Sequence, residues 1–284
     1  MPYIDKVWIT GANGRLGSEL VRFLNPYDFE VLTNDIDDLD ITNIEDVSIF
    51  ADINRPKVII NCASITNVLE CENNPEYAFR INALGARNIA VVANKIKAKL
   101  VHLSTDNVFD GSSSIPYKEF DKENPSTVYG ESKLLGEKFI RDLCTKFFII
   151  RSSWIYTRSS NFINNLIENA KKGNENIVAK NQISSPTSAS ELAKFIVKIM
   201  NTSEYGIYHA SCEGVVSRRE FAEFLLEQLN LPVNVKEEEK IGDRIYKPDY
   251  SVLDNFLLRV GGLYTFPNWK DDVKRFVKEE VIER

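Results

Sequence analysis

Trp8-Ile-Thr-Gly-Ala-Asn-Gly-Arg-Leu-Gly17 is the most informative segment of this chain for its fold class. The apolar residues around its start predict a short buried strand over 6–10, and the residues that follow predict a helix over 15–24. Three glycines at this junction let a pyrophosphate approach the backbone, where a helix start offers free amides. The G-x-x-G-x-x-G spacing leaves two interpretations open, a dinucleotide site and a plain tight turn.

Strand-like and helix-like segments alternate through the first half of the chain. Strands are predicted over residues 6–10, 29–33, 57–61, 99–104 and 146–151, and helices over 15–24, 44–52, 75–96 and 128–143. This alternation is typical of an α/β fold, a Rossmann-type doubly wound parallel sheet with helices on both faces. Beyond residue 151 we expect helices over 160–172, 188–200, 218–229 and 269–281 and a strand over 205–209. The charge run 236–240 indicates solvated surface.

Tyr129 and Lys133 are four residues apart, which places both side chains on one face of a helix. An ammonium beside a phenol favours the phenolate, so we expect the pKa of Tyr129 to be lowered toward neutrality. Thr105, at the end of a predicted strand, offers a hydroxyl to the same reacting oxygen. These three residues predict proton transfer to or from a carbonyl group.

Composition excludes several classes of function. The 284 residues carry a net charge of −6, which disfavours a nucleic-acid partner. The chain has four cysteines in no C-x-x-C pair and only two histidines, so we predict no metal site and a reducing, cytoplasmic setting. We also expect no signal peptide and no membrane partner, since no apolar run approaches the ~20 residues that span a bilayer.

Several sequence blocks, in order, carry a resemblance to a known family. They are Leu39-Asp-Ile-Thr42, Asn61-Cys-Ala-Ser64, Ser104-Thr-Asp-Asn-Val-Phe-Asp-Gly111, Pro116-Tyr-Lys-Glu119, Tyr129-Gly-Glu-Ser-Lys133, Leu135-Gly-Glu137, Arg151-Ser-Ser-Trp-Ile-Tyr156, Pro186-Thr187 and Phe266-Pro-Asn-Trp269. With the glycine turn, they resemble the extended short-chain dehydrogenase/reductase family over nearly the whole length. Within it, the chain looks like the reductases that act on the C4 keto group of dTDP-linked 4-keto-6-deoxy sugars.

The resemblance implies a division of labour along the chain. Residues 1–150 would form the NAD(P)-binding Rossmann domain. Residues 151–284 would form mainly a smaller, mixed α/β substrate-binding lobe, called the smaller lobe below, with part of 176–210 returning to the sheet. A sugar-nucleotide substrate and a monomer or homodimer are expected. Glu19 fits one position of an interfacial metal site known in some relatives, but Ser190 occupies another, so no metal is predicted there.

The resemblance also implies roles for single residues. Tyr129, Lys133 and Thr105 would be catalytic, with Lys133 also bonding the nicotinamide ribose. Asn82 is similar to a family catalytic asparagine, although a buried structural amide is an open alternative. The expected cofactor-binding residues are Gly11, Asn13, Gly14, Arg15, Leu16, Gly17, Asp35, Asp40, Ile41, Cys62, Ala63, Ser64, Thr66, Asn82, Ser104, Tyr129 and Lys133.

Cofactor preference depends on two charged residues. Asp35 lies about 20 residues beyond the glycines, where an acid binds the ribose hydroxyls of NAD, whereas Arg15 would attract a 2′-phosphate. An exposed Arg15–Asp35 ion pair is the structural alternative. The resembled reductases favour NADP(H) and accept NAD(H), which is the expectation here. Asp40 would meet the adenine, with capping of the next helix as its alternative.

The expected substrate-binding residues are Asp106, Asn107, Phe109, Ser153, Trp154, Asn161 and Lys247. The chain departs from the family at Asn107, where a tyrosine is usual, at Leu69, where an aspartate is usual, and at Ser184, where a glycine is common. Two alternatives stay open. One is a reductase, epimerase or dehydratase acting on another sugar nucleotide, and the other is a non-catalytic NADP-binding regulatory subunit similar to the methionine adenosyltransferase β subunit.

Overall fold

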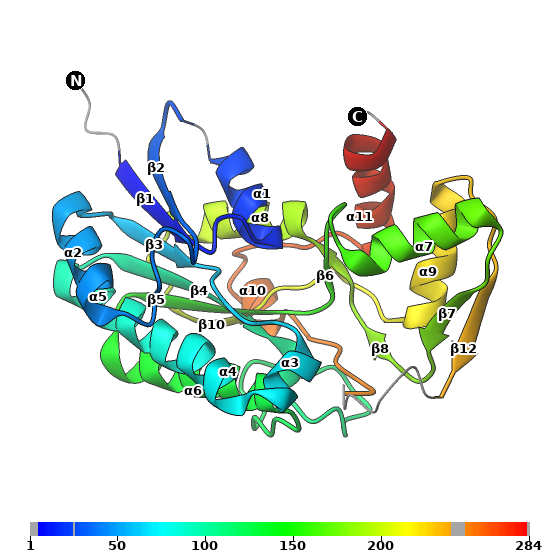
Figure 1. The fold of residues 1–284 in the computed structure, drawn as a ribbon, viewed down its shortest axis with the longest axis horizontal. Helices are drawn as coiled ribbons and strands as arrows, with labels where there is room; N and C mark the ends of the chain where they lie inside the picture. Colours follow the sequence, from blue (N-terminus) through cyan, green and yellow to red (C-terminus); the bar gives the residue numbers. More distant parts are fainter. Residues whose placement is uncertain (1–4, 25, 240–247, 283–284) are drawn as a thin grey trace.

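The computed structural model describes residues 5–24, 26–239 and 248–282. Its central strands are β1 (Asp5–Thr10), β2 (Phe29–Asn34), β3 (Val58–Asn61), β4 (Lys99–Thr105), β5 (Phe147–Ser152) and β10 (Gly206–His209). They form one six-stranded sheet in the order β10-β5-β4-β3-β1-β2, and every neighbouring pair is parallel (Figure 1). The strand order reverses at β1, so the carboxyl end of this strand lies at the switch point where such sheets bind ligands.

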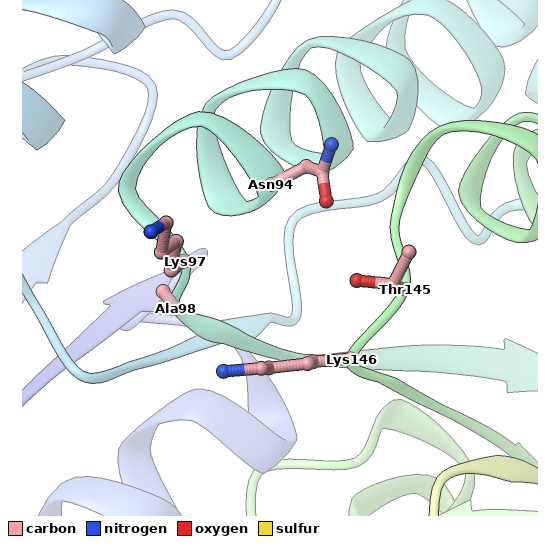
Figure 2. A pocket seen from close by; sticks show the side chains of 5 residues that line it. All are labelled: Asn94, Lys97, Ala98, Thr145 and Lys146. Carbon is pink, nitrogen blue, oxygen red and sulfur yellow. The ribbon is translucent and has the colours of Figure 1, made fainter.

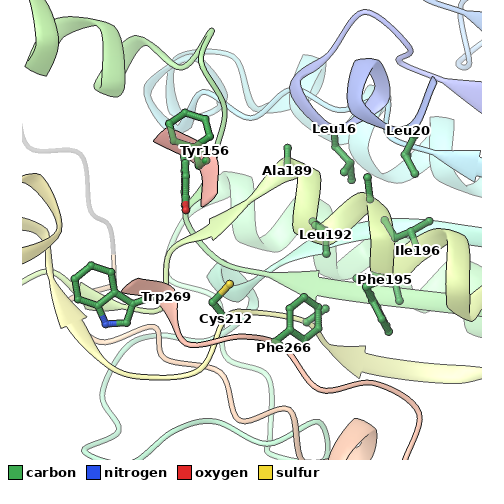
Figure 3. Packing of buried hydrophobic residues seen from close by; sticks show 14 of the residues in the cluster. Leu16, Leu20, Tyr156, Ala189, Leu192, Phe195, Ile196, Cys212, Phe266 and Trp269 are labelled. Carbon is green, nitrogen blue, oxygen red and sulfur yellow. The ribbon is translucent and has the colours of Figure 1, made fainter. Parts of the chain in front are cut away.

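Both faces of this sheet are buried, because alternate residues of each strand face opposite helix layers. Val7 and Ile9 pack with α1 (Arg15–Phe23) and α8 (Ala189–Ile199). Trp8 faces the other way and packs with α5 (Ala86–Ile96) and α6 (Val128–Leu143). Figure 3 shows the first of these layers, with side chains of α1 beside those of α8. The predicted doubly wound α/β class is confirmed.

The predicted helix over 75–96 is present, but its middle is unusual. The chain forms α4 (Pro75–Phe79), then the π-helical segment η1 (Arg80–Gly85), then α5. The first half of the chain also forms α2 (Ile44–Asn54), the short α3 (Val68–Asn73) and η2 (Asp106–Val108) after β4. Single π-helical turns inside a helix often occur at functional sites, and this one carries Asn82.

The second half of the chain adds small sheets and helices beside the main sheet (Figure 1). The helical elements are α7 (Asn161–Lys172), α9 (Arg218–Gln228), α10 (Phe256–Val260), α11 (Trp269–Phe276) and η3 (Val277–Ile282). The strands are β6 (Ile155–Tyr156), β7 (Asn176–Ala179), β8 (Ile183–Ser184), β9 (Thr187–Ser188), β11 (Val216–Ser217) and β12 (Val235–Glu238), which pair as β6–β9, β7–β12 and β8–β11. The predicted strand over 205–209 is β10, which joins the edge of the main sheet.

The described part of the charge run lies at the surface, as its composition indicated, and its backbone is also paired. Residues 235–238 form β12, which pairs in parallel with β7. Its side chains are partly exposed, and Lys236 lies 3.9 Å from a carboxylate oxygen of Glu175. Such an edge strand keeps its charges in water while its backbone is paired. Lys240, at the end of the run, is outside the described residues.

Candidate active site

The glycine turn joins the end of β1 to α1 and leaves room for a ligand. Gly11 has φ +67°, and a Cβ at this position would lie 2.6 Å from the backbone nitrogen of Ala63 after β3. Only glycine fits this close approach. Gly14 caps α1 without any side-chain hydrogen bond, so the first amides of the helix have no side-chain acceptor at the cap. The turn thus fits a dinucleotide, whose pyrophosphate would meet these amides.

Asp35 ties the end of β2 to this turn. Its carboxylate accepts a hydrogen bond of 2.9 Å from the backbone N–H of Asn13. Arg15 does not pair with it in the described part of the chain, and instead donates to the Thr66 hydroxyl at 3.3 Å. The alternative of an Arg15–Asp35 ion pair is therefore wrong.

Asp40 and the buried residues beside it have local structural roles. Asp40 accepts from the backbone N–H of Thr42, and Asn43 is the residue whose side chain caps α2. The alternative in which Asp40 caps that helix is wrong. Leu16 and Ile41 are 3% and 5% exposed in the two core layers, so any contact with a nucleotide would be through their backbone.

The carboxyl end of β4 carries a compact polar cluster. The Thr105 hydroxyl donates to Asp106 at 2.9 Å and accepts from the backbone N–H of Asn107. The Asn107 side-chain amide donates to both Thr105 and Asp106. Ser153, which follows β5, donates to the other Asp106 oxygen at 2.7 Å and contacts the Ser184 hydroxyl. Four of the predicted site residues are thus brought together, three of them consecutive at the end of β4 and the fourth, Ser153, 47 residues from Asp106.

Tyr129 reaches the same cluster from α6. Burial raises the pKa of its hydroxyl to about 12, and a hydrogen bond with Thr105 acts in the opposite direction. The expectation of a lowered pKa is wrong for this structure, because desolvation outweighs the attraction of cations. The Lys133 ammonium donates to the Leu103 carbonyl at 2.7 Å and lies 3.5 Å from the His102 ring. Burial lowers the pKa of Lys133 to about 8.

Asn82 and its neighbours form a fixed wall beside the site. The Asn82 amide oxygen accepts from the Ser64 hydroxyl and the Ile65 N–H, and its amide nitrogen donates to the Ile65 carbonyl and to Ser132. These bonds favour the structural alternative for the Asn82 side chain. Cys62 and Ala63 lie in the same loop after β3, where burial raises the pKa of the Cys62 thiol to about 12.

The predicted substrate residues are not all in one place. Trp154 follows Ser153 directly and has φ +40°, a left-handed conformation that is rare for an aromatic residue. Asn161 is exposed at the start of α7. Phe109 is 1% exposed and stacks on Tyr117 at 4.3 Å, so it packs a core cluster and does not line the site as predicted. Lys247 lies outside the described residues.

Sequence reasoning missed a buried ion cluster behind the site. Arg151 and Glu137 are both 0% exposed, and their closest atoms are 2.7 Å apart. The Glu137 carboxylate also accepts a hydrogen bond of 2.5 Å from the Ser104 hydroxyl, and the Arg151 guanidinium forms a second ion pair with Glu123. The sequence did carry a signal for this cluster, because the charged Arg151 directly follows Phe147-Phe-Ile-Ile150, the apolar run of a buried strand. The cluster fixes α6, which carries Tyr129 and Lys133, against the ends of β4 and β5.

A pocket elsewhere on the described residues is not a second candidate for the active site. A pocket of about 290 Å³, lined by Asn94, Lys97, Ala98, Thr145 and Lys146, lies at the opposite edge of the sheet, where β4 and β5 begin (Figure 2). Ligands of open parallel sheets bind at the carboxyl edge instead. Within 5–24, 26–239 and 248–282 no helix is long and apolar enough to cross a membrane. The same residues hold no group of three metal-ligating side chains.

Several known proteins are similar to this chain over nearly its whole length. The family model described as "RmlD substrate binding domain" matches residues 5–282. The spore coat polysaccharide biosynthesis protein SpsK of Bacillus subtilis is 35% identical over 97% of this chain and 98% of its own. The dTDP-4-dehydrorhamnose reductase of Escherichia coli is 31% identical over 96% and 97%. The crystal structure of dTDP-4-dehydrorhamnose reductase from Bacillus anthracis in complex with NADP superposes with a TM-score of 0.94, at 39% identity over 98% and 99% of the two chains.

Proposed function

The chain belongs to the RmlD substrate binding domain family, and on that premise we propose that it reduces the C4 keto group of a dTDP-linked 4-keto-6-deoxy sugar. It is an oxidoreductase. We propose that it uses NADP(H) in preference to NAD(H), because the similar structure at 39% identity is in complex with NADP. The substrate we propose is dTDP-4-dehydro-L-rhamnose. The observation that carries the proposal is the polar cluster of Thr105, Asp106, Asn107 and Ser153 at the carboxyl edge of the sheet, with the buried Tyr129 of α6 interacting with Thr105.

Each residue has a physical task in this proposal. The nicotinamide supplies the hydride when the cofactor is bound. Tyr129, whose pKa is about 12, holds its proton at neutral pH and donates it to the oxygen that becomes negative at C4. The Thr105 hydroxyl, fixed by Asp106 and Asn107, bonds the same oxygen. Lys133, held by its bond to the Leu103 carbonyl, would bond the ribose of the nicotinamide.

The division of the chain follows the same proposal. Residues 1–150 bind the cofactor, and 151–284 mainly bind the sugar nucleotide, with β10 contributed to the sheet. The four cysteines carry no disulfide, which supports a cytoplasmic location. We propose a monomer or a homodimer, which gel filtration with light scattering would measure.

The direct test is oxidation of NADPH and NADH by the purified protein with dTDP-4-dehydro-L-rhamnose. Turnover should fall by roughly 10²- to 10⁴-fold in Tyr129→Phe, while NADPH affinity stays unchanged. Tyr27→Phe, which alters an exposed phenol, is the matched control. Unchanged turnover in Tyr129→Phe would remove this residue from the mechanism. NADPH binding without turnover would point to another sugar nucleotide or to the regulatory-subunit alternative.

A further inference from the structure

Arg218, which sequence reasoning did not select, lies on the predicted sugar-binding tryptophan. Its guanidinium carbon is 3.3 Å from the centre of the Trp154 ring and 4.9 Å from that of Phe162. Its Nε donates a long hydrogen bond of 3.4 Å to the Gln182 side chain, and its backbone N–H bonds the Gln182 carbonyl. The β5–β6 connection, α7, the residues before β8 and the start of α9 therefore converge on one cation.

This cation has no counter-ion among the residues that the structure describes. Burial lowers the pKa of Arg218 to about 9, and the charge of Asp106 acts against this shift without an ion pair. The Asp106 oxygens are already taken by Thr105, Asn107 and Ser153. Apart from Nε, the nitrogens of the guanidinium have no hydrogen-bond acceptor in the described part of the chain. A partly desolvated charge of this kind is costly unless a ligand pairs with it.

The position of Arg218 joins it to the catalytic cluster through Trp154. Ser153 is bonded to Asp106, Asp106 to Thr105, and Thr105 to Tyr129. Trp154 is the next residue after Ser153, and its left-handed backbone costs of order 1–3 kcal/mol. Strain of this kind persists at ligand sites, where the surrounding structure fixes it. The stacked pair therefore lies next to the catalytic cluster along the chain.

We propose that Arg218 is a substrate-binding residue whose guanidinium, stacked on Trp154, binds the diphosphate of the sugar nucleotide. This inference rests on the proposed function for the identity of the ligand class. A planar guanidinium presents parallel N–H donors that match two phosphate oxygens, and a diphosphate supplies the missing negative charge. Stacking on the indole holds the fork in one orientation, which reduces the entropy lost on binding.

The test is calorimetric titration of the full chain with dTDP and with thymidine, which lacks the phosphates. In Arg218→Met, dTDP affinity should fall roughly 10- to 100-fold while thymidine affinity is unchanged. Arg218→Lys keeps the charge without the planar fork and should lose less dTDP affinity than Arg218→Met. Arg219→Gln is the matched control, because Arg219 is exposed on the same helix and pairs with Glu223.

Turnover separates this proposal from the proposed function. With the sugar nucleotide, Arg218→Met should raise KM by a similar factor and change kcat by less. Equal losses of affinity for dTDP and thymidine would show that Arg218 only supports the structure of the pocket, and this result would overturn the inference. Unchanged dTDP affinity in both Arg218 variants would also overturn it, and so would a wild-type protein that does not bind dTDP. If dTDP affinity depends on Arg218 but no turnover occurs, the proposed reduction fails and the diphosphate site stands.

Discussion

At the scale of single residues, burial controls protonation around the end of β4. Tyr129 is shifted to a pKa of about 12 and Lys133 to about 8, each mainly by desolvation. These shifts have opposite signs because burial disfavours the phenolate of one group and the ammonium of the other. A phenol that keeps its proton is suited to a reaction that ends with a protonated alcohol.

The buried pair of Glu137 and Arg151 should dominate the stability of the site. Glu137→Gln leaves the Arg151 charge without its main partner, so we expect the free energy of unfolding to fall by about 3–5 kcal/mol. Urea denaturation measures this loss. Glu131→Gln, an exposed change on the same helix, should stay within about 0.5 kcal/mol of the wild type. Equal stabilities of the two variants would contradict the role given to the pair.

The two histidines predict a pH dependence of stability. Burial lowers the pKa of His102 well below its ordinary value and that of His209 to about 3. In the unfolded chain each takes up a proton near pH 6.5, so the unfolded state binds more protons below that pH. The contribution of the two histidines to the free energy of unfolding is therefore fully present above about pH 6.5. It falls as the pH drops below that value, by about 1.4 kcal/mol per pH unit for each histidine.

The contribution of one histidine can be isolated by substitution. His209 donates from Nδ1 to the Tyr117 carbonyl, and its other ring nitrogen is buried without a partner in the described structure. We expect His209→Gln to reduce the dependence of unfolding free energy on pH, measured by urea denaturation at neutral pH and about one unit below pH 6.5. An unchanged slope would mean that His209 titrates alike in both states.

At the scale of elements, close packing sets the position of α6. A Cβ at Gly136 would lie 2.5 Å from the Asn82 carbonyl oxygen in η1. The glycine thus lets the helix that carries Tyr129 and Lys133 approach the helix that carries Asn82. A helix interior normally disfavours glycine by about 1 kcal/mol, so the contact outweighs that cost.

Gly136→Ala should therefore destabilise the protein despite its better helix propensity. We expect a loss of about 1–3 kcal/mol in unfolding free energy and reduced turnover, because α6 must move away from η1. Lys138→Ala is the control, since this side chain is exposed on the same helix and the change also places alanine, the best helix former, in α6. A Gly136→Ala variant that is more stable than the wild type would show that η1 shifts to accommodate the added methyl group at little cost in free energy.

At the scale of the whole molecule, one core joins the two halves of the chain. A single cluster of buried apolar residues extends from Val7 in β1 to Val277 after α11 and includes α1 and α8. The last strand of the main sheet, β10, also comes from the second half. The proposed cofactor-binding and substrate-binding parts therefore interleave in their packing.

This packing predicts one cooperative unfolding transition for the full chain. Heating followed by far-ultraviolet and near-ultraviolet circular dichroism should give coincident curves. A fragment of residues 1–150 should not fold stably, because it lacks β10 and α8 and exposes the apolar face that they cover. Two separated transitions, or a folded fragment, would show that the halves are independent units.

The sequence alone determined the doubly wound sheet, the glycine turn and the order of the catalytic blocks. Each of these is a local pattern: β1 and β3 read as apolar runs because both sheet faces are buried, and the turn needs glycine at Gly11. Local periodicity is enough for such features, since neighbouring residues enforce it. The family resemblance supplied the remaining site residues, and it placed Phe109 in the wrong role.

Which side chains share an environment follows from the folded arrangement of distant segments. The distance between Lys133 and the Tyr129 hydroxyl depends on where Leu103 and His102 lie, and the protonation of both depends on burial by the whole fold. Arg218 meets Trp154 across 64 residues of sequence, and nothing in either segment indicates the contact. Desolvation and long-range contacts arise when distant segments pack together, and for this reason spacing along the chain could not predict them.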